Sequence, residues 1–211
     1  MHRGRFITFE GMDGCGKTTQ LRMLATSLRD KGKFVVETVE PGGTEIGQQI
    51  RRILLDPANS SIHARAELLL YFASRAQNVE QVIRPALADG HIVLCDRFTD
   101  STLAYQGCGR GLDTGMVLEL DRIACQGLKP DATILIDIDP ATSLARARRR
   151  NERTDSSESR IDEESFAFHE RVRRGYQALA ARDPERFIAI DGRGSIGEVG
   201  AAIREALSQR V

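Results

Sequence analysis

Short apolar runs recur along the chain, and five of them are rich in β-branched and aromatic residues. They cover Arg5–Glu10, Phe34–Val39, His91–Cys95, Thr133–Ile138 and Phe187–Ile190. Most of these runs are apolar almost throughout rather than at alternate positions, which is typical of strands buried on both faces of a parallel sheet. The pattern therefore predicts five buried strands.

Segments with helical spacing of apolar residues lie between these runs. The first places Leu21, Leu24 and Leu28 on one stripe and has Gly32 just past its expected end. Further helices are predicted over Glu45–Leu55, Ala64–Ile83 (which Pro85 then interrupts or restarts), Thr114–Cys125, Ala141–Arg150, Glu163–Ala181 and Ile196–Ser208. Strands that alternate with helices indicate an α/β fold, with a five-stranded parallel sheet and helices on both faces. We expect residues 1–211 to form one domain.

Composition and charge exclude several classes of protein. The 211 residues are 41% apolar and 28% charged, which is typical of a globular domain. The 30 Lys and Arg balance 30 Asp and Glu, so we expect no nucleic-acid partner, because such domains are usually basic. The longest apolar runs fall far short of the roughly 20 residues of a membrane span. Four cysteines without metal-site spacing favour reduced thiols and a cytoplasmic protein.

Polar or loop-forming residues follow all five predicted strands. In open α/β sheets the ligand lies at the carboxyl ends of the strands, so these residues are expected to meet at one rim. The segments are Gly11–Thr18, Glu40–Thr44, Asp96–Arg97, Asp137 with Asp139, and Asp191–Gly192.

The first of these segments has the pattern Gly-x-x-x-x-Gly-Lys-Thr between a strand and a helix. Its glycines let backbone N–H groups turn onto phosphate oxygens, and the helix beginning near Lys17 points its positive dipole end at the same anion. We expect Lys17 to reach the β- and γ-phosphates and Thr18 to offer its hydroxyl to Mg²⁺. The alternative is an accidental glycine-rich turn. The motif predicts binding of a nucleoside triphosphate, whatever reaction follows.

A carboxylate closes the third predicted strand. Asp96 is at a position from which it can hold Mg²⁺ or its waters, and Arg97 follows it. The alternative is a solvated surface ion pair, which poorly explains an Asp-Arg pair at the end of a buried strand. The nearest segment to a guanine-reading Asn-Lys-x-Asp is Leu128–Asp131, which lacks the Asn and so disfavours a GTP-dependent switch.

Tyr71 and Arg75 are four residues apart and therefore share one face of a predicted helix. An aromatic ring with a guanidinium one turn away can stack on a base and bond to its edge. The alternative for this pair alone is a core aromatic with a surface arginine.

Taken together, the motifs resemble those of the bacterial thymidylate kinase family. They occur in the family's order and span the chain from about Phe6 to Asp191. The segments that carry the resemblance are Phe9–Thr19, Glu40–Thr44, Tyr71 with Arg75, Asp96–Phe98, Ala104–Gly107 and Arg160–Asp162.

The resemblance implies a P-loop homodimer that transfers the γ-phosphoryl group of ATP to dTMP with Mg²⁺. The residues it places at ATP are Gly11, Met12, Asp13, Gly14, Cys15, Gly16, Lys17, Thr18, Thr19 and Arg146. Those it places at dTMP are Asp13, Glu40, Arg51, Tyr71, Arg75, Arg97, Thr102, Tyr105 and Gln106.

Individual roles also come from the resemblance. Tyr71 would stack on thymine and Arg75 would bond a base carbonyl, while Thr102 and Gln106 would read the base edge. Tyr105 would crowd the sugar 2′ position, and Asp13 would face the 3′-hydroxyl or the phosphate of dTMP. Arg97, supported by Arg51, would hold the acceptor phosphate. Glu40 and Asp96 would lie near the magnesium ion.

The resemblance also implies a lid over ATP, at residues 147–161. Some family members supply a catalytic arginine from the P-loop at the position that Gly14 occupies here. In this chain the charge would come from the lid, with Arg146 stacking on adenine and Arg150 reaching the transferred phosphoryl group. Weaker candidates are Arg148, Arg149, Arg153 and Arg160. Asn151–Ser159 reads as a mobile loop.

Three points stay open at this stage. A kinase for another nucleoside monophosphate and a nucleotide-dependent switch are the alternative functions. Cys15, beside a helix N-terminus, is expected to have a lowered thiol pKa, so that its oxidation or alkylation would block ATP.

Overall fold

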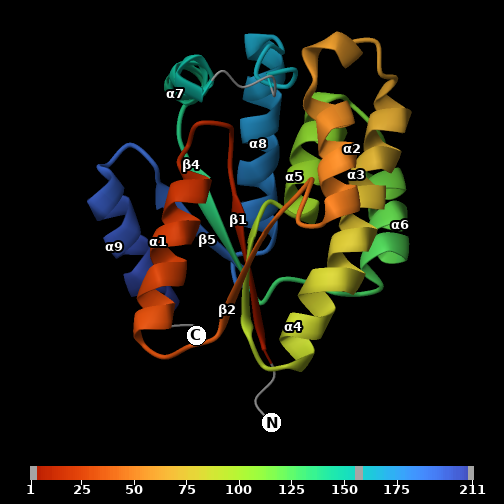
Figure 1. The fold of residues 1–211 in the computed structure, drawn as a ribbon. Coiled ribbons are helices and arrows are strands. Elements are labelled where there is room, and N and C mark those ends of the chain that lie inside the picture. The colour runs from red at the N-terminus through yellow and green to blue at the C-terminus, as the bar shows by residue number, and fades with distance from the viewer. Residues whose placement is uncertain (1–3, 155–158, 209–211) are drawn as a thin grey trace.

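The predicted strands pair into one parallel sheet. The computed structural model describes residues 4–154 and 159–208. The strands are β1 (Arg5–Glu10), β2 (Val35–Val39), β3 (Ile92–Asp96), β4 (Ala132–Asp137) and β5 (Phe187–Asp191). They lie in the order β2-β3-β1-β4-β5, with every pairing parallel (Figure 1). The five predicted strands are confirmed, each to within one residue at either end.

Helices cover both faces of this sheet. On one face lie α1 (Lys17–Asp30) and α9 (Ile196–Ser208), and on the other lie α3 (Ala64–Asn78), α4 (Arg84–Ala88), α6 (Thr114–Cys125) and α8 (Phe166–Arg182) (Figure 1). The other helical elements are α2 (Glu45–Leu55), η1 (Pro57–Asn59), η2 (Val79–Ile83), α5 (Thr99–Thr102), η3 (Leu103–Gly109) and α7 (Pro140–Thr154).

Alternate residues of the central strands fill two separate apolar layers. Ile7 and Phe9 of β1 pack with Leu21 and Leu24 of α1. Phe6, on the opposite face of the same strand, packs with residues of α3, α4 and α6. The continuous apolar runs of the sequence reflect this burial on both faces, so the three-layer prediction is confirmed. Among the described residues, no helix is long and apolar enough to span a membrane.

Besides the short η1, the helical segment at residues 99–109 was not predicted. Residues 99–109 form α5 and the π-helical turn η3, and most of their side chains are buried. The buried side chains include Asp100, Ser101, Thr102 and Gln106, which are polar. A helix whose buried side is polar gives no apolar periodicity, so the pattern of the sequence did not indicate it.

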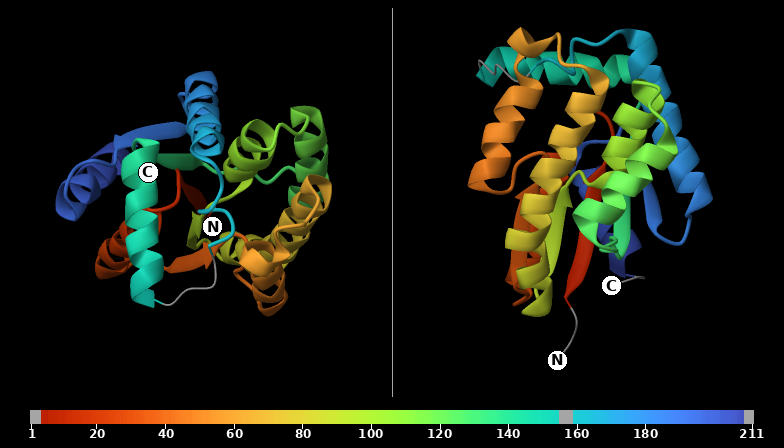
Figure 2. Two further views of the ribbon diagram at one scale, coloured as in Figure 1. Left: turned by 90° about the horizontal axis from the view of Figure 1, so that it is seen from above. Right: turned by 90° about the vertical axis from the view of Figure 1, so that its right-hand side faces the viewer.

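The predicted loop over Asn151–Ser159 is partly wrong. Helix α7 continues through Thr154, four residues beyond its predicted end, and residues 155–158 lie outside the described part of the chain. The run from Arg146 to Thr154 contains no Gly or Pro that would end a helix. Helix α7 crosses above the carboxyl ends of the strands (Figure 2), where the candidate site lies.

Candidate active site

The loop between β1 and α1 has the geometry of a phosphate-binding loop. Gly16 directly precedes α1 at φ 102°, a left-handed conformation that suits glycine. Gly14 also has a positive φ, and a Cβ atom there would lie 2.3 Å from the backbone oxygen of Ser143 in α7. The hydroxyl of Ser143 donates to the backbone oxygen of Asp13 at 2.5 Å. Helix α7 therefore packs directly on the loop and leaves no room for an arginine at position 14.

Lys17 and Thr18 begin α1 beside the end of β3. The Nζ atom of Lys17 donates to the backbone oxygen of Met12 at 2.9 Å, and the side chain is largely buried. The hydroxyl of Thr18 donates to Oδ2 of Asp96 at 2.5 Å. The P-loop hydroxyl and the carboxylate at the end of β3 are thus brought together, as the sequence predicts.

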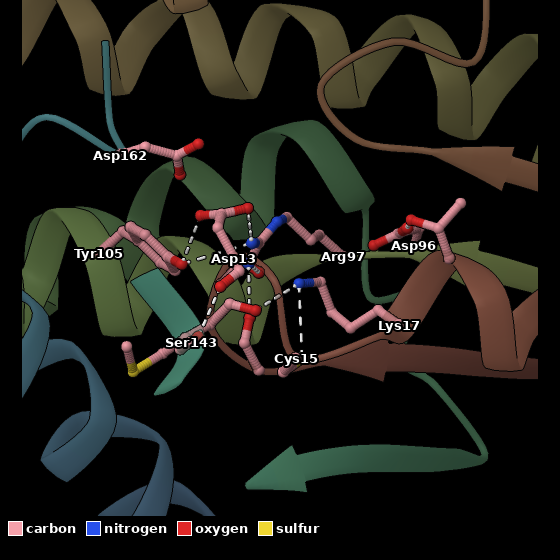
Figure 3. A network of polar contacts seen from close by, with 12 residues as sticks. Asp13, Cys15, Lys17, Asp96, Arg97, Tyr105, Ser143 and Asp162 are labelled. Atoms are coloured by element: carbon pink, nitrogen blue, oxygen red, sulfur yellow. Dashed lines mark hydrogen bonds and ion pairs between the residues drawn. The ribbon is translucent and has the colours of Figure 1, made fainter. Parts of the chain in front are cut away.

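Arg97 and Asp13 form the centre of the site (Figure 3). Nη2 of Arg97 lies 2.6 Å from Oδ1 of Asp13, and the Tyr105 hydroxyl donates to Oδ2 of the same carboxylate at 2.8 Å. Burial alone would raise the pKa of Asp13, but Arg97 and then Lys17 hold it well below its usual range. Burial raises the pKa of Tyr105. At neutral pH this cluster consists of a carboxylate, a guanidinium and a neutral phenol.

A second group of polar side chains comes from α3 and its neighbours. Nε of Arg75 lies 2.5 Å from Oε2 of Glu40, and its Nη2 donates to the Thr102 hydroxyl at 2.9 Å. Asn78 donates to the other Glu40 oxygen at 3.0 Å. Burial, with the charge of Glu67 next, raises the pKa of Tyr71 to about 12, so its hydroxyl stays neutral. We call Tyr71, Arg75, Thr102 and Gln106 the base wall.

Glu40 lies next to Asp96 and also contacts the base wall: its backbone N–H donates to the Asp96 backbone oxygen at 2.9 Å, and its side chain meets Arg75. Both of its carboxylate oxygens are engaged, by Arg75 and by Asn78, and the side chain is buried. Burial raises the pKa of Glu40 even with Arg75 beside it. Its described side-chain contacts are those of a counter-ion for Arg75 that supports the base wall. Its place near the magnesium ion stays a prediction.

Helix α7 and the segment after residue 158 close the top of the site. Nη1 of Arg146 donates to the backbone oxygen of Gly192 at 3.1 Å. Nη2 of Arg150 lies 3.2 Å from Oδ2 of Asp162. Burial, and then the charge of Asp13, raises the pKa of Asp162 to about 6.

Arg160 differs from the other arginines of this region. It is almost completely buried, with Nε donating to the backbone oxygen of Leu54 and Nη2 lying 2.7 Å from Oε2 of Glu67. An arginine held in this way is not placed to reach a phosphate, so its candidacy as a lid arginine is wrong. It anchors the end of the predicted lid to α2 and α3.

The expectation for Cys15 is also wrong. Its thiol is buried, and this burial raises the pKa of Cys15 above its usual value despite the nearby charges of Lys17 and Arg97. Loss of hydration therefore outweighs the helix N-terminus and the cations here. The thiol packs with apolar residues of the core and lies 3.8 Å from Nζ of Lys17, and because it is buried and neutral we expect slow oxidation and alkylation.

One cavity of about 760 Å³ joins the P-loop to the base wall. Predicted residues that line it are Asp13, Gly14, Gly16, Lys17, Thr18, Thr19, Glu40, Arg51, Tyr71, Arg75, Asp96, Arg97, Thr102, Tyr105, Gln106, Arg146 and Arg150. Three predicted P-loop residues do not line the cavity, namely Gly11, Met12 and Cys15. They lie beneath its wall, and Met12 and Cys15 are buried. Further lining residues that were not predicted include Leu55 and Ser101, and Ile161 of the predicted lid also lines the cavity.

Glu10 is a buried residue behind the site that sequence reasoning missed. It accepts hydrogen bonds from the Phe98 backbone at 2.7 Å, from the Ser101 hydroxyl at 2.5 Å and from the Tyr176 hydroxyl at 3.0 Å. Burial, with Asp100 next, raises the pKa of Glu10 to about 7. The same two hydroxyls contact Nη1 of Arg97. A glutamate inside an apolar strand is the one sequence signal that pointed to this network.

A triphosphate-binding loop and a base wall that share one cavity define a P-loop nucleoside-monophosphate kinase. The family model described as thymidylate kinase matches residues 9–203. The chain belongs to the thymidylate kinase family.

Individual relatives agree with this assignment. The chain is 52% identical over 209 residues to thymidylate kinase of Geobacter sulfurreducens, covering 99% of this chain and 98% of that one. It is 53% identical over 201 residues to thymidylate kinase of Pelobacter propionicus, covering 95% and 92%. Its fold is similar to the crystal structure of thymidylate kinase from Ehrlichia chaffeensis, with a TM-score of 0.79, 32% identity, and coverage of 97% and 99%.

Proposed function

We propose that the protein transfers the γ-phosphoryl group of ATP to dTMP, giving ADP and dTDP. The observation that carries this proposal is the single cavity in which the P-loop faces one end and the base wall the other. Basic side chains outnumber acidic ones in its lining, which suits two polyanionic ligands although the chain as a whole is neutral.

We propose that Arg97 holds the acceptor phosphate. Its guanidinium lies beside Asp13 and over the Tyr105 ring, whose centroid is 4.9 Å away. Burial opposes the charge, but Asp13, Tyr105, Tyr176 and Asp96 together outweigh burial and raise the pKa of Arg97. Arg97 has a φ of 73°, which turns the chain sharply after β3. A fixed, permanently charged guanidinium at this point would bring two phosphates together against their repulsion.

No strong general base is needed for this reaction, because the acceptor is an ionised phosphate. We therefore give Asp96 a metal-binding and positioning role. Thr18 and Asp96 present a hydroxyl and a carboxylate side by side, and Mg²⁺ is commonly held by one or two such oxygens together with water and substrate phosphates. When bound there, the ion would neutralise charge that develops on the phosphate oxygens.

We propose that residues 147–161 act as a lid within the single domain 1–211. Arg146 and Arg150 line the cavity from α7, above the P-loop. Arg150 is half exposed and contacts Asn151 and Asp162, so its own charge is not locked in the interior and can reach a phosphate in the cavity. We propose that Arg150 stabilises the transferred phosphoryl group and that Arg146 packs against adenine.

We also propose a homodimer, as the resemblance implies. Helix α3 packs between α2 and α6 (Figure 1). Large apolar side chains on these three helices are exposed to solvent, namely Ile46, Ile53, Leu69, Leu118 and Ile123. A second copy would bury them, and sedimentation of the wild type against Leu69→Glu tests this. A cytoplasmic location stays a prediction from the cysteine pattern.

The proposal is tested by ADP formation with Mg-ATP and a panel of acceptors: dTMP, dUMP, UMP, CMP, AMP and GMP. We expect dTMP to give the highest kcat/KM. A better acceptor among the others would overturn the choice of dTMP and support a kinase for that monophosphate. ADP release that dTMP does not change would instead support a nucleotide-dependent switch.

A further inference from the structure

Glu67 lies directly behind the base wall. It is on α3 one turn before Tyr71 and two turns before Arg75, so the three side chains share one helix face. Glu67 itself is completely buried and does not line the cavity. A buried carboxylate next to a binding site that it does not enter needs a physical explanation.

Every described hydrogen-bond partner of the Glu67 side chain is a donor. Nε2 of Gln106 donates to Oε1 at 3.0 Å, Arg110 donates to both oxygens at 3.2 Å, and Arg160 donates to Oε2 at 2.7 Å. Burial alone would raise the pKa of Glu67, but these donors lower it. Glu67 is therefore ionised at neutral pH and can only accept hydrogen bonds.

This carboxylate determines which way the Gln106 amide faces. A glutamine side chain has a donor NH₂ and an acceptor oxygen, and its orientation follows from the network around it. Because Glu67 only accepts, the NH₂ group must face it. Gln106 lines the cavity, and within the described part of the chain no residue donates to its Oε1. The oxygen is thus left to accept a hydrogen bond from a ligand.

We propose that Glu67 is a positioning residue for base selection: it holds the Gln106 amide so that Oε1 accepts a ring N–H, and so favours thymine and uracil over cytosine. This inference rests on the proposed function. At ring position 3, thymine and uracil carry an N–H donor, whereas cytosine carries an unprotonated nitrogen that only accepts. An acceptor held against that nitrogen would leave two lone pairs facing each other without a proton.

Arg75 supports the same selection. Its Nη1 atom is buried and has no hydrogen-bond partner among the described residues. Next to an acceptor on Gln106, this free donor matches a base edge on which a carbonyl flanks an N–H. On cytosine both groups are reversed: the ring nitrogen at position 3 accepts instead of donating, and an amino group donates where thymine and uracil have the carbonyl acceptor.

A purely structural role for Glu67 is the competing explanation, since it neutralises Arg110 and Arg160. The two explanations predict different ratios of kcat/KM between acceptors. A structural defect lowers kcat/KM for all acceptors together, whereas loss of amide orientation changes the preference between bases. The pair dTMP and dUMP provides an internal control because their ring edges have the same donors and acceptors.

The test compares kcat/KM for dTMP, dUMP and dCMP in wild type, Glu67→Gln and the control Arg110→Gln. A glutamine at 67 can donate as well as accept, so Gln106 is free to turn its NH₂ towards the cavity. We expect the dTMP-to-dCMP ratio to fall at least about tenfold in Glu67→Gln, while the dTMP-to-dUMP ratio stays within about threefold. Arg110→Gln removes a neighbouring charge but keeps the Glu67–Gln106 contact, and both ratios should stay within about threefold.

An unchanged dTMP-to-dCMP ratio in a folded Glu67→Gln protein would overturn the proposal, even if all three rates fell. If Glu67→Gln does not fold, the double variant Glu67→Gln/Arg110→Gln replaces it, because it removes one negative and one positive charge together. We expect the same fall in the dTMP-to-dCMP ratio in this double variant. Failure of the proposed function has a separate signature, because the wild type would then form no ADP in response to dTMP.

Discussion

Replacement of Arg75 tests how the base wall is held together. The residue is 1% exposed, and its guanidinium carbon lies 4.8 and 5.1 Å from the ring centroids of Phe72 and Phe98. It bridges Glu40 and Thr102, at 2.5 and 2.9 Å. Burial opposes the charge, but Glu40 raises the pKa of Arg75, so the side chain is a permanent counter-ion.

The change Arg75→Met keeps most of the apolar stem but leaves the Glu40 carboxylate buried with Asn78 as its described side-chain partner. Breaking a buried ion pair by removing one partner costs about 3–5 kcal/mol. For a chain of this length, each kcal/mol lowers Tm by about 2–4 °C, so we expect a fall of about 6–20 °C. The variant should also bind dTMP more weakly, because the donor to the base is lost.

Urea unfolding followed by circular dichroism measures the free energy of unfolding of Arg75→Met. The controls are Glu40→Gln and the double variant Glu40→Gln/Arg75→Met. The double variant leaves neither charge behind, so it should be more stable than Arg75→Met alone. If Arg75→Met loses less than about 1 kcal/mol of unfolding free energy while its KM for dTMP rises, Arg75 acts on the ligand only and the reasoning is refuted.

Four further predictions follow from the site. Lys17→Ala should lower kcat at least about 100-fold, because a preorganised phosphate donor is lost, and steady-state kinetics at saturating dTMP measures it. Arg150→Ala should lower kcat about 100-fold or more with dTMP affinity nearly unchanged; a normal kcat would refute its role at the transferred phosphoryl group. Because burial raises the folded-state pKa of Glu10 to about 7, the stabilisation from its protonated form is present below pH 4.5 and is lost as pH rises through 7. Relative to Glu10→Gln, the wild type should therefore lose up to about 3 kcal/mol across this range in urea titrations. Maleimide at pH 7 should label Cys15 at least about tenfold more slowly than the exposed Cys108, as peptide mass spectrometry would show, and equal rates would contradict the protected thiol.

The strands and the P-loop could be predicted because their signals are local. Continuous apolar runs such as Thr133–Ile138 reflect burial on both faces of the sheet, and the loop motif places its chemistry within eight residues. The helical segment over residues 99–109 was missed because many of its buried side chains are polar, so that its few apolar core residues, such as Ala104 and Tyr105, give no helical period.

Contacts between distant charges could not be predicted at all. Glu67 and Arg160 are 93 residues apart, and neither has a neighbour in the sequence that indicates the pairing. The pairing of Glu40 with Arg75 was likewise not indicated by the sequence, and burial reversed the expected pKa shift of Cys15. In each case the outcome depends on how much water the fold removes from a charged or ionisable group, which only the packed structure shows.

The central claim is that one cavity brings ATP and dTMP together for direct phosphoryl transfer. The most direct measurement follows the label from γ-³²P-ATP with dTMP, Mg²⁺ and enzyme, with separation of products by chromatography. We expect label to appear in dTDP in a one-to-one ratio with ADP, and Lys17→Ala to abolish this transfer. Label that appears in inorganic phosphate instead, at a rate that dTMP does not change, would contradict the account.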